Sequence, residues 1–187
     1  GPTGGWTSIA SFASSSSLDP SDGAVLDGLG LSATDRAALG AATVARLRAS
    51  AGDDASCTNL YAASRPVVLG VGPSFVDRGG FRFTGHLPLP DNASAPWRLL
   101  GRGPGAPVAA VLDDATARWG LKLGGVGSRF SLPDEEGVPV EFEIVGLLEP
   151  GILQGWVIVG ESDFERLFPS RSGYAMALID AGDADAG

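Results

Sequence analysis

The sequence predicts an α+β fold in which short helices accompany mixed β-sheets, and three observations carry this prediction. Residues 138–147 alternate apolar and polar side chains with a period of two, which is typical of a strand with one buried and one wet face. Wholly apolar runs at residues 108–112 and 156–159 indicate two further, fully buried strands. Helical spacing is limited to short segments such as residues 161–168.

The centre of the chain reads as a β-hairpin. Residues 128–132 predict its first strand, residues 133–137 a polar turn, and residues 138–147 its second strand, which Pro150 and Gly151 stop. One face of the second strand is expected to be buried and to carry Val138, Val140, Phe142, Ile144 and Leu147, with Glu141 and Glu143 on the wet face. We expect this hairpin to be core structure rather than a functional site.

Strands are also expected before the hairpin, at residues 6–13, 43–49, 66–71 and 81–84. In the second of these we expect Val44 and Leu47 to point inward, and Arg46 and Arg48 outward. Short helices are expected at residues 20–29, with Asp19 as N-cap, and at residues 32–39.

A helical turn capped by Ser74 is expected to end before Gly79. Five prolines within residues 85–107 predict a long irregular loop, in which Trp97, Leu99 and Leu100 are apolar enough to be held in the core. Asp113 is the expected N-cap of a short helix at residues 114–119. A last strand is predicted at residues 174–179.

Composition limits the class of partner. The chain has 187 residues, enough for one domain or two small subdomains, and a net charge of −9 with a single lysine, Lys122. Nucleic-acid binding needs many Lys and Arg side chains to neutralise phosphates, so no nucleic-acid partner is expected. The single cysteine, Cys57, excludes an intramolecular disulfide. The chain begins Gly1-Pro2 without methionine, and we expect it to be a soluble segment of a longer protein.

The residues that usually carry chemistry are sparse and scattered. His86 is the only histidine and Cys57 the only thiol, so neither a zinc site nor a cysteine–histidine pair is indicated. The acidic pairs, such as Asp113-Asp114, have local roles in caps and turns. We therefore expect no catalytic residue, no cofactor, no ATP binding and no stoichiometric metal. The alternatives are a secreted hydrolase that uses these acids with His86 or Cys57, and a stand-alone module that binds a peptide or a glycan.

The order of motifs resembles a known family. The run VAAVLDDATA at residues 108–117, Leu123-Gly124, and EFEIVGLLEPG at residues 141–151 resemble the extracytoplasmic domain of MacB-like and FtsX-like ABC transporter permeases. Further similar segments are the opening TGGW, GDDASCTNLY with PVVLGV, and ILQGWVIVGESDFERLFPSRSGY. The likeness spans nearly the whole chain and rests on the order and spacing of packing and turn signals.

The resemblance implies two parts. Residues 1–55 and 173–187 would form a porter-like, membrane-proximal subdomain, and residues 56–172 an inserted α+β lobe that contains the hairpin. Family members continue into a helix and a strand after residue 180, so the porter-like part would be incomplete here.

The resemblance also implies the function. The domain would lie outside the cell membrane, tethered to transmembrane helices of the same permease, and would perform no covalent chemistry. It would couple movement driven by a cytoplasmic ATPase to substrate export, lipoprotein release or activation of a partner. A second permease copy or an extracytoplasmic protein would be its further partner.

One short link stands out as a candidate contact with such a partner. Residues 152–155 carry two large aliphatic side chains although links of this kind are normally polar. Leu153, Gln154 and Trp156 are the candidate contact residues, with Trp156 included because tryptophan is frequent at binding hot spots. The alternative is that Ile152 and Leu153 plug the end of the sheet.

Overall fold

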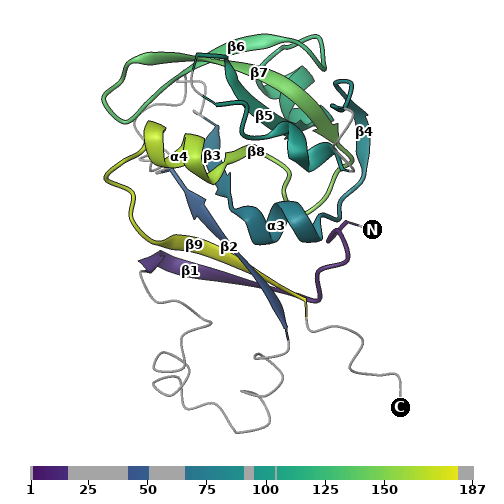
Figure 1. Ribbon diagram of the computed structural model, residues 1–187, viewed down its shortest axis with the longest axis vertical. Helices are drawn as coiled ribbons and strands as arrows, with labels where there is room; N and C mark the ends of the chain where they lie inside the picture. Colours follow the sequence, from purple (N-terminus) through teal and green to yellow (C-terminus); the bar gives the residue numbers. More distant parts are fainter. Residues whose placement is uncertain (1, 17–41, 51–65, 91–94, 104, 181–187) are drawn as a thin grey trace, which may run out of the picture.

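The computed structural model describes residues 2–16, 42–50, 66–90, 95–103 and 105–180 (Figure 1). The helices expected at residues 20–29 and 32–39, and Cys57, lie outside these residues.

The described strands form one mixed nine-stranded sheet, which confirms the predicted α+β class. Its order is β1-β9-β2-β3-β8-β5-β7-β4, with β6 paired to β7. The β3–β8 and β5–β7 pairs are parallel, and the other pairs are antiparallel. The strands are β1 (Ser8–Ser16), β2 (Thr43–Ala49), β3 (Val67–Val71), β4 (Phe83–His86), β5 (Val108–Asp113), β6 (Arg129–Pro133), β7 (Pro139–Leu148), β8 (Trp156–Gly160) and β9 (Tyr174–Asp180). The helical elements are α3 (Pro73–Arg78), the 3₁₀ turn η1 (Pro96–Leu99), the π-helical turn η2 (Thr116–Gly120) and α4 (Glu161–Leu167).

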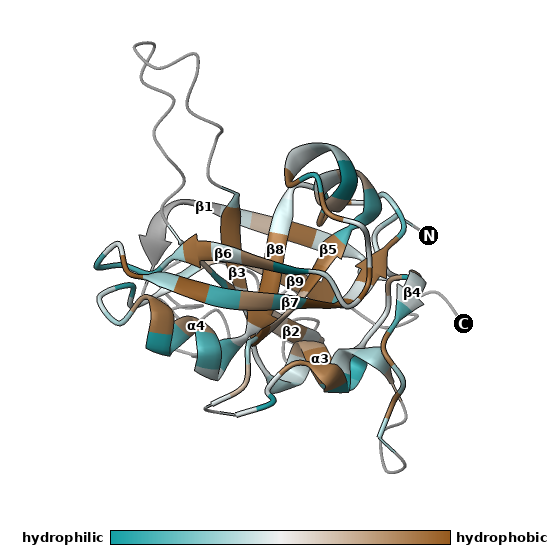
Figure 2. Ribbon diagram, turned by 90° about the horizontal axis from the view of Figure 1, so that it is seen from above, coloured by the Kyte–Doolittle hydropathy of each residue, from teal (hydrophilic) through white to brown (hydrophobic). Residues whose placement is uncertain are grey.

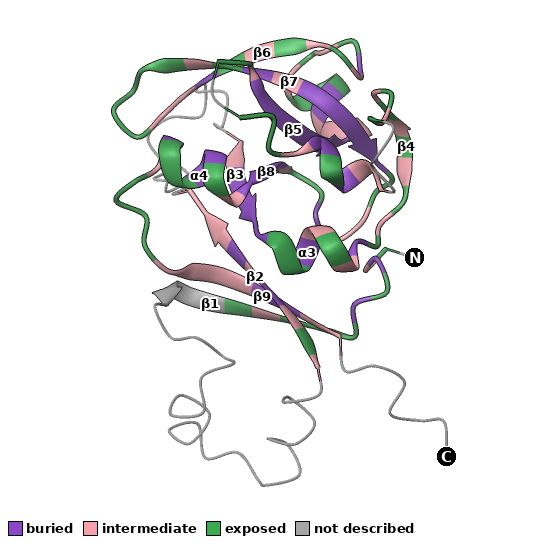
Figure 3. Ribbon diagram, in the orientation of Figure 1, coloured by how far each residue is buried: buried purple, intermediate pink, exposed green. Residues whose placement is uncertain are grey.

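The central strands are buried on both faces (Figure 3). Successive side chains of a strand point to opposite faces, so β5 and β8 feed two cores, and apolar residues fill them almost without interruption (Figure 2). Phe75 of α3 and Trp97 of η1 cover one face, and Phe164 of α4 covers the other. The prediction that Trp97 and Leu99 are held in the core is confirmed, since they are 1% and 5% exposed.

Strand β7 contains a bulge that changes which residues face each core. Ile144 lies opposite Ala110 of β5, whereas the next pair is Gly146 with Val111, so Val145 is an additional residue. The bulge returns Leu147 to the face that Phe142 and Ile144 share, as predicted. At Gly146 a Cβ would lie 2.6 Å from the Phe83 ring, so this position requires glycine.

Three local predictions are wrong. Val138 is 52% exposed, because it lies in the hairpin turn before β7 begins. In β2 the buried residues are Ala45 and Leu47, because Val44 has the parity of the arginines and shares their face. Ser74 caps no helix, since α3 begins at Pro73 with Gly72 as N-cap.

Most strand boundaries follow the sequence closely, but β1 (Ser8–Ser16) begins two residues and ends three residues later than the predicted range of 6–13. Residues 43–49 form β2 as expected, and β3, β5, β8, α4 and β9 lie within one residue of their predicted ranges. Strand β4 begins two residues late, because Phe81 has a φ of 57° and leaves extended conformation.

The predicted two-part division stays a prediction. The strands assigned to the membrane-proximal part, β1, β9 and β2, are contiguous at one end of the sheet order. The sheet continues across the division through the pairing of Leu47 with Val71. Leu47 and Leu178 also share a core with Leu69.

Replacing Ile144 with alanine tests the role of the hairpin as core. Ile144 is 0% exposed, so Ile144→Ala is expected to lower the free energy of unfolding by about 2–5 kcal/mol. Urea denaturation measures the change. Val138→Ala at the 52% exposed turn is the matched control and should change stability by less than about 0.5 kcal/mol. An unchanged midpoint for Ile144→Ala would contradict the assignment.

Candidate functional site

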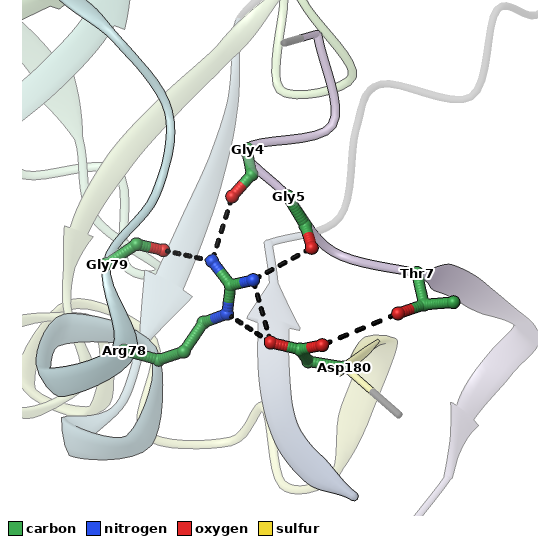
Figure 4. Close-up of polar contacts among 6 residues, drawn as sticks. All are labelled: Gly4, Gly5, Thr7, Arg78, Gly79 and Asp180. Carbon is green, nitrogen blue, oxygen red and sulfur yellow. Dashed lines mark hydrogen bonds and ion pairs between the residues drawn. The ribbon is translucent and has the colours of Figure 1, made fainter. Parts of the chain in front are cut away.

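Arg78, at the last residue of α3, connects both ends of the described chain to the body of the sheet (Figure 4). Its Nη1 donates to the Gly4 carbonyl at 2.8 Å and its Nη2 to the Gly5 carbonyl at 2.8 Å. Its Nε donates to the Asp180 carboxylate at 2.9 Å, and Nη2 lies 2.7 Å from the same oxygen. The guanidinium also lies over the Trp6 ring, 4.5 Å from a ring centroid. We call these five residues the Arg78 clamp.

The glycines around Arg78 permit this close approach. Gly4 and Gly5 have φ angles of 62° and 82°, which are strained for residues with a side chain. A Cβ at Gly80 would lie 2.1 Å from the Gly4 carbonyl oxygen. These glycines therefore allow the backbone after α3 to contact the backbone of the N-terminal segment. The Arg78 guanidinium lies between the two and donates to the Gly4 and Gly5 carbonyls.

The clamp suits arginine in particular. A planar guanidinium presents several N–H donors in fixed directions, whereas a lysine ammonium is a point charge on a flexible stem. Arg78 and Asp180 are partly shielded, with side chains 22% and 25% exposed. Thr7 adds a further hydrogen bond to Asp180 at 3.4 Å. The clamp thus holds the start of β1, the end of β9 and α3 as one unit.

A second buried charge, Asp113, anchors the turn between β7 and β8. Its carboxylate accepts hydrogen bonds from the Thr116 N–H at 2.9 Å, the Thr116 hydroxyl at 2.5 Å and the Gly155 N–H at 2.9 Å. Burial by itself raises the pKa of Asp113, but these hydrogen bonds outweigh burial and leave the pKa below its usual value of 3.8. The predicted capping role of Asp113 is confirmed, and the carboxylate has the additional role of fixing residue 155.

The predicted partner-contact residues divide between core and surface. Leu153 is 2% exposed and belongs to the core, so the expectation that its side chain meets a partner is wrong. The link folds back because Ile152 N–H donates to the Pro2 carbonyl at 3.1 Å, and the apolar side chains then close the end of the sheet. Gln154 is exposed and Trp156 is half-buried, so both stay candidates.

A charged groove with a volume of about 490 Å³ lies where α3 and α4 begin. Its acidic side chains are paired with arginines. Arg98 lies 2.6 Å from Asp77, and Arg48 lies 3.1 Å from Glu161 and 3.3 Å from Glu165. These acids are therefore engaged in ion pairs that join neighbouring elements.

A second groove, of about 400 Å³, lies beside η2 and is lined by Thr84, Gly85, Asp114, Ala115, Arg118, Trp119, Leu147 and Pro150. Trp119 is 82% exposed, the highest exposure among the large apolar side chains of the described residues. The sequence signalled a short helix here but not the exposure of this indole. A tryptophan after a charged residue in a segment whose other apolar residues are small alanines is the only hint.

Of the two isolated candidate residues, His86 lies within the described part of the chain and Cys57 lies outside it. His86 Nδ1 lies 2.8 Å from the Leu87 carbonyl, a contact that requires the proton on Nδ1. Within the described ranges, no group of three or more His, Cys, Asp or Glu side chains could hold a metal ion. The same residues contain no helix long and apolar enough to cross a membrane.

Comparison of the chain with protein-family models gives no match, and comparison with curated proteins finds none of significant similarity.

The geometry of the Arg78 clamp predicts that a positive charge at residue 78 is not enough to preserve stability without the guanidinium group. Arg78→Lys loses the fork that reaches Gly4, Gly5 and Asp180 together, so we expect a loss of about 1–3 kcal/mol in unfolding free energy. Arg98→Lys is the control, since its pair with Asp77 is more than half exposed and should be worth less than about 1 kcal/mol. Equal losses for the two variants in urea titrations would show that the clamp adds nothing particular.

Asp113 predicts an acid-dependent contribution to stability. Because its folded pKa is lowered, the contribution is fully present above the unfolded value near 3.8 and is lost as the pH falls through the folded pKa. Asp113→Asn places an amide where the Gly155 N–H needs an acceptor, with an expected loss of about 1–3 kcal/mol at neutral pH. Urea midpoints of both proteins from pH 7 down to below pH 4 measure the difference, which should shrink at the acid end. A pH-independent difference would refute an ionised Asp113.

Proposed function

We propose that this chain is a non-enzymatic extracytoplasmic domain of an ABC transporter permease of the MacB-like or FtsX-like kind. The supporting observation is that the first and last described strands pair side by side, with Ser8 opposite Ile179, and that one arginine ties both to the body. The order of elements along the chain supports the same proposal.

Paired strands of this kind suit a domain held between two transmembrane helices. If one helix precedes β1 and the next follows β9, the two connections reach the domain at the same edge of the sheet. A displacement of either helix then acts on the Arg78 clamp. Charge-assisted hydrogen bonds between 2.7 and 2.9 Å resist separation, so the displacement moves α3 and the sheet together.

The output of such a domain is mechanical. The partners we propose are the transmembrane helices of the same permease, a cytoplasmic ATPase acting through them, and a second permease copy or an extracytoplasmic protein. Movement of the domain would serve substrate export, lipoprotein release or activation of that partner. Of the predicted contact residues, Gln154 in the β7–β8 link and Trp156 at the start of β8 retain exposed surface for this contact.

Energy transfer in the intact permease, reconstituted in lipid with its ATPase, tests the coupling. A donor dye is attached at Val138→Cys in a Cys57→Ser background, and acceptor dyes are placed on the lipid headgroups. Val138 is exposed in the hairpin turn and lies outside the clamp. A dye at this position should therefore disturb neither the core nor the Arg78 clamp. We expect transfer to change when ATP is trapped in the ATPase, because the sheet moves relative to the membrane.

Arg78→Lys should reduce this change, whereas Arg98→Lys should leave it intact. If the labelled protein with Arg78 intact shows the same energy transfer with and without trapped ATP, the coupling proposal is overturned.

The same Val138→Cys protein tests on which side of the membrane the domain lies. In whole cells a membrane-impermeant maleimide should label this cysteine. Labelling that occurs only after lysis would contradict an extracytoplasmic location.

A further inference from the structure

Trp119 is presented outward by an unusual helical turn. In η2 the Leu121 N–H donates to the Thr116 carbonyl at 2.9 Å, a five-residue spacing that widens the turn. Ala117 faces the core, while Arg118, Trp119 and Gly120 are exposed. Helical turns of this kind occur frequently at functional sites.

The turn is a firm platform rather than a loose loop. The buried Asp113 carboxylate holds Thr116 through both its N–H and its hydroxyl, and η2 follows directly on strand β5, which is buried throughout. The Leu123 N–H also donates to the Ala117 carbonyl at 2.8 Å, closing the turn at its other end. An indole that is 82% exposed on such a platform costs little conformational entropy when a ligand covers it.

The groove beside the indole offers polar groups at short range. Arg118 Nε donates to Asp114 Oδ1 at 2.8 Å, and the two side chains are 59% and 36% exposed, so both keep further hydrogen-bonding capacity. Thr84 contributes a hydroxyl that donates to the Leu147 carbonyl at 3.4 Å and keeps lone pairs to accept a further hydrogen bond, while the side chains of Leu147 and Pro150 contribute an apolar wall. The groove thus combines one flat aromatic surface, a neutral ion pair and a hydroxyl.

The size of the groove decides between a protein and a small ligand. A stable protein interface covers roughly 800 Å² on each partner and has several apolar anchors at its centre. The other exposed large apolar side chains of the described chain are Ile9 in β1 and Val138 in the hairpin turn, on different elements. A single aromatic residue beside about 400 Å³ matches instead the usual size of a small-ligand site.

We propose that this groove binds a neutral oligosaccharide, one pyranose ring of which stacks on Trp119. The electron-rich face of the indole attracts the weakly positive C–H face of a sugar ring. Asp114 and the Thr84 hydroxyl oxygen would accept hydrogen bonds from sugar hydroxyls, and Arg118 would donate to them. The groove's own ion pair is neutral and the chain carries a net charge of −9, which disfavours anionic glycans.

The flat indole surface favours sugars whose ring substituents are equatorial, such as cello- and chito-oligosaccharides. Equatorial substituents leave a continuous C–H face on the ring, which an exposed indole can cover without steric conflict. This site does not depend on the proposed transport function, because a free module and a permease domain would present it equally.

Nuclear magnetic resonance titration of the 187-residue chain tests the proposal directly. Cellotetraose and chitotetraose are added separately to about 10 mM, a range that detects dissociation constants near 1 mM. The four tryptophans give separate indole N–H signals, and Trp119→Phe identifies the one at residue 119. We expect the Trp119 signal to shift with at least one sugar, while the buried Trp6 and Trp97 signals stay in place.

Trp119→Ala should weaken binding at least about tenfold, and Asp114→Asn about threefold or more, without changing the urea midpoint since Trp119 lies outside the core. Val138→Ala, at the exposed hairpin turn outside the groove, is the matched surface control and should bind as the parent does. Two results would overturn the inference: no shift of the Trp119 signal with either sugar, or binding that survives Trp119→Ala. A Trp119 signal that responds only to a proline-rich peptide or to lipid vesicles, run as separate arms, would also overturn it.

Discussion

The structure depends on the burial of β3, β8 and β5 on both faces. A strand with two buried faces needs cover on each side, and here α3 with residues 81–90 and 95–100 covers one face while α4 covers the other. The cover is close enough to require glycine in the sheet. A Cβ at Gly70 would lie 2.7 Å from Phe164, and one at Gly146 would lie 2.6 Å from Phe83. The short helices are therefore stabilised by their fit to the sheet more than by their own length.

Two charged side chains, the partly buried Arg78 and the buried Asp113, connect segments that are not joined by strand pairing. Arg78 joins residues that are 74 and 102 positions away, and Asp113 fixes Gly155 at a separation of 42 positions. Each charge is surrounded by several hydrogen-bonding partners, which offsets the free-energy cost of removing it from water. Trp6 shows the contrast: its buried indole N–H has no hydrogen-bond partner in the described chain, and the Arg78 guanidinium over its ring supplies a compensating attraction.

The clamp and the groove beside η2 belong to different parts of the sheet. The clamp lies where β1 and β9 meet α3, while the groove lies beside β4, β7 and the turn after β5. One continuous sheet connects them, since β1 and β9 lie at one end of its strand order and β5, β7 and β4 at the other. A domain that moves as one body through its clamp would carry the groove with it.

The sequence by itself determined the strands and most of their inward faces. Periodicity and punctuation are local properties, so β2, β5, β8, α4 and the hairpin could be predicted from the residues alone. Val44 was placed on the wrong face although its parity with Arg46 and Arg48 is visible in the sequence. The sequence could not give the late start of β4 after Phe81 or the burial of Leu153, because these depend on which segments pack against them. The Arg78 clamp and the exposure of Trp119 were decided only by the tertiary structure. The clamp joins residues from three distant segments, and the exposure follows from a π-helical turn that has no distinct periodic signal in sequence.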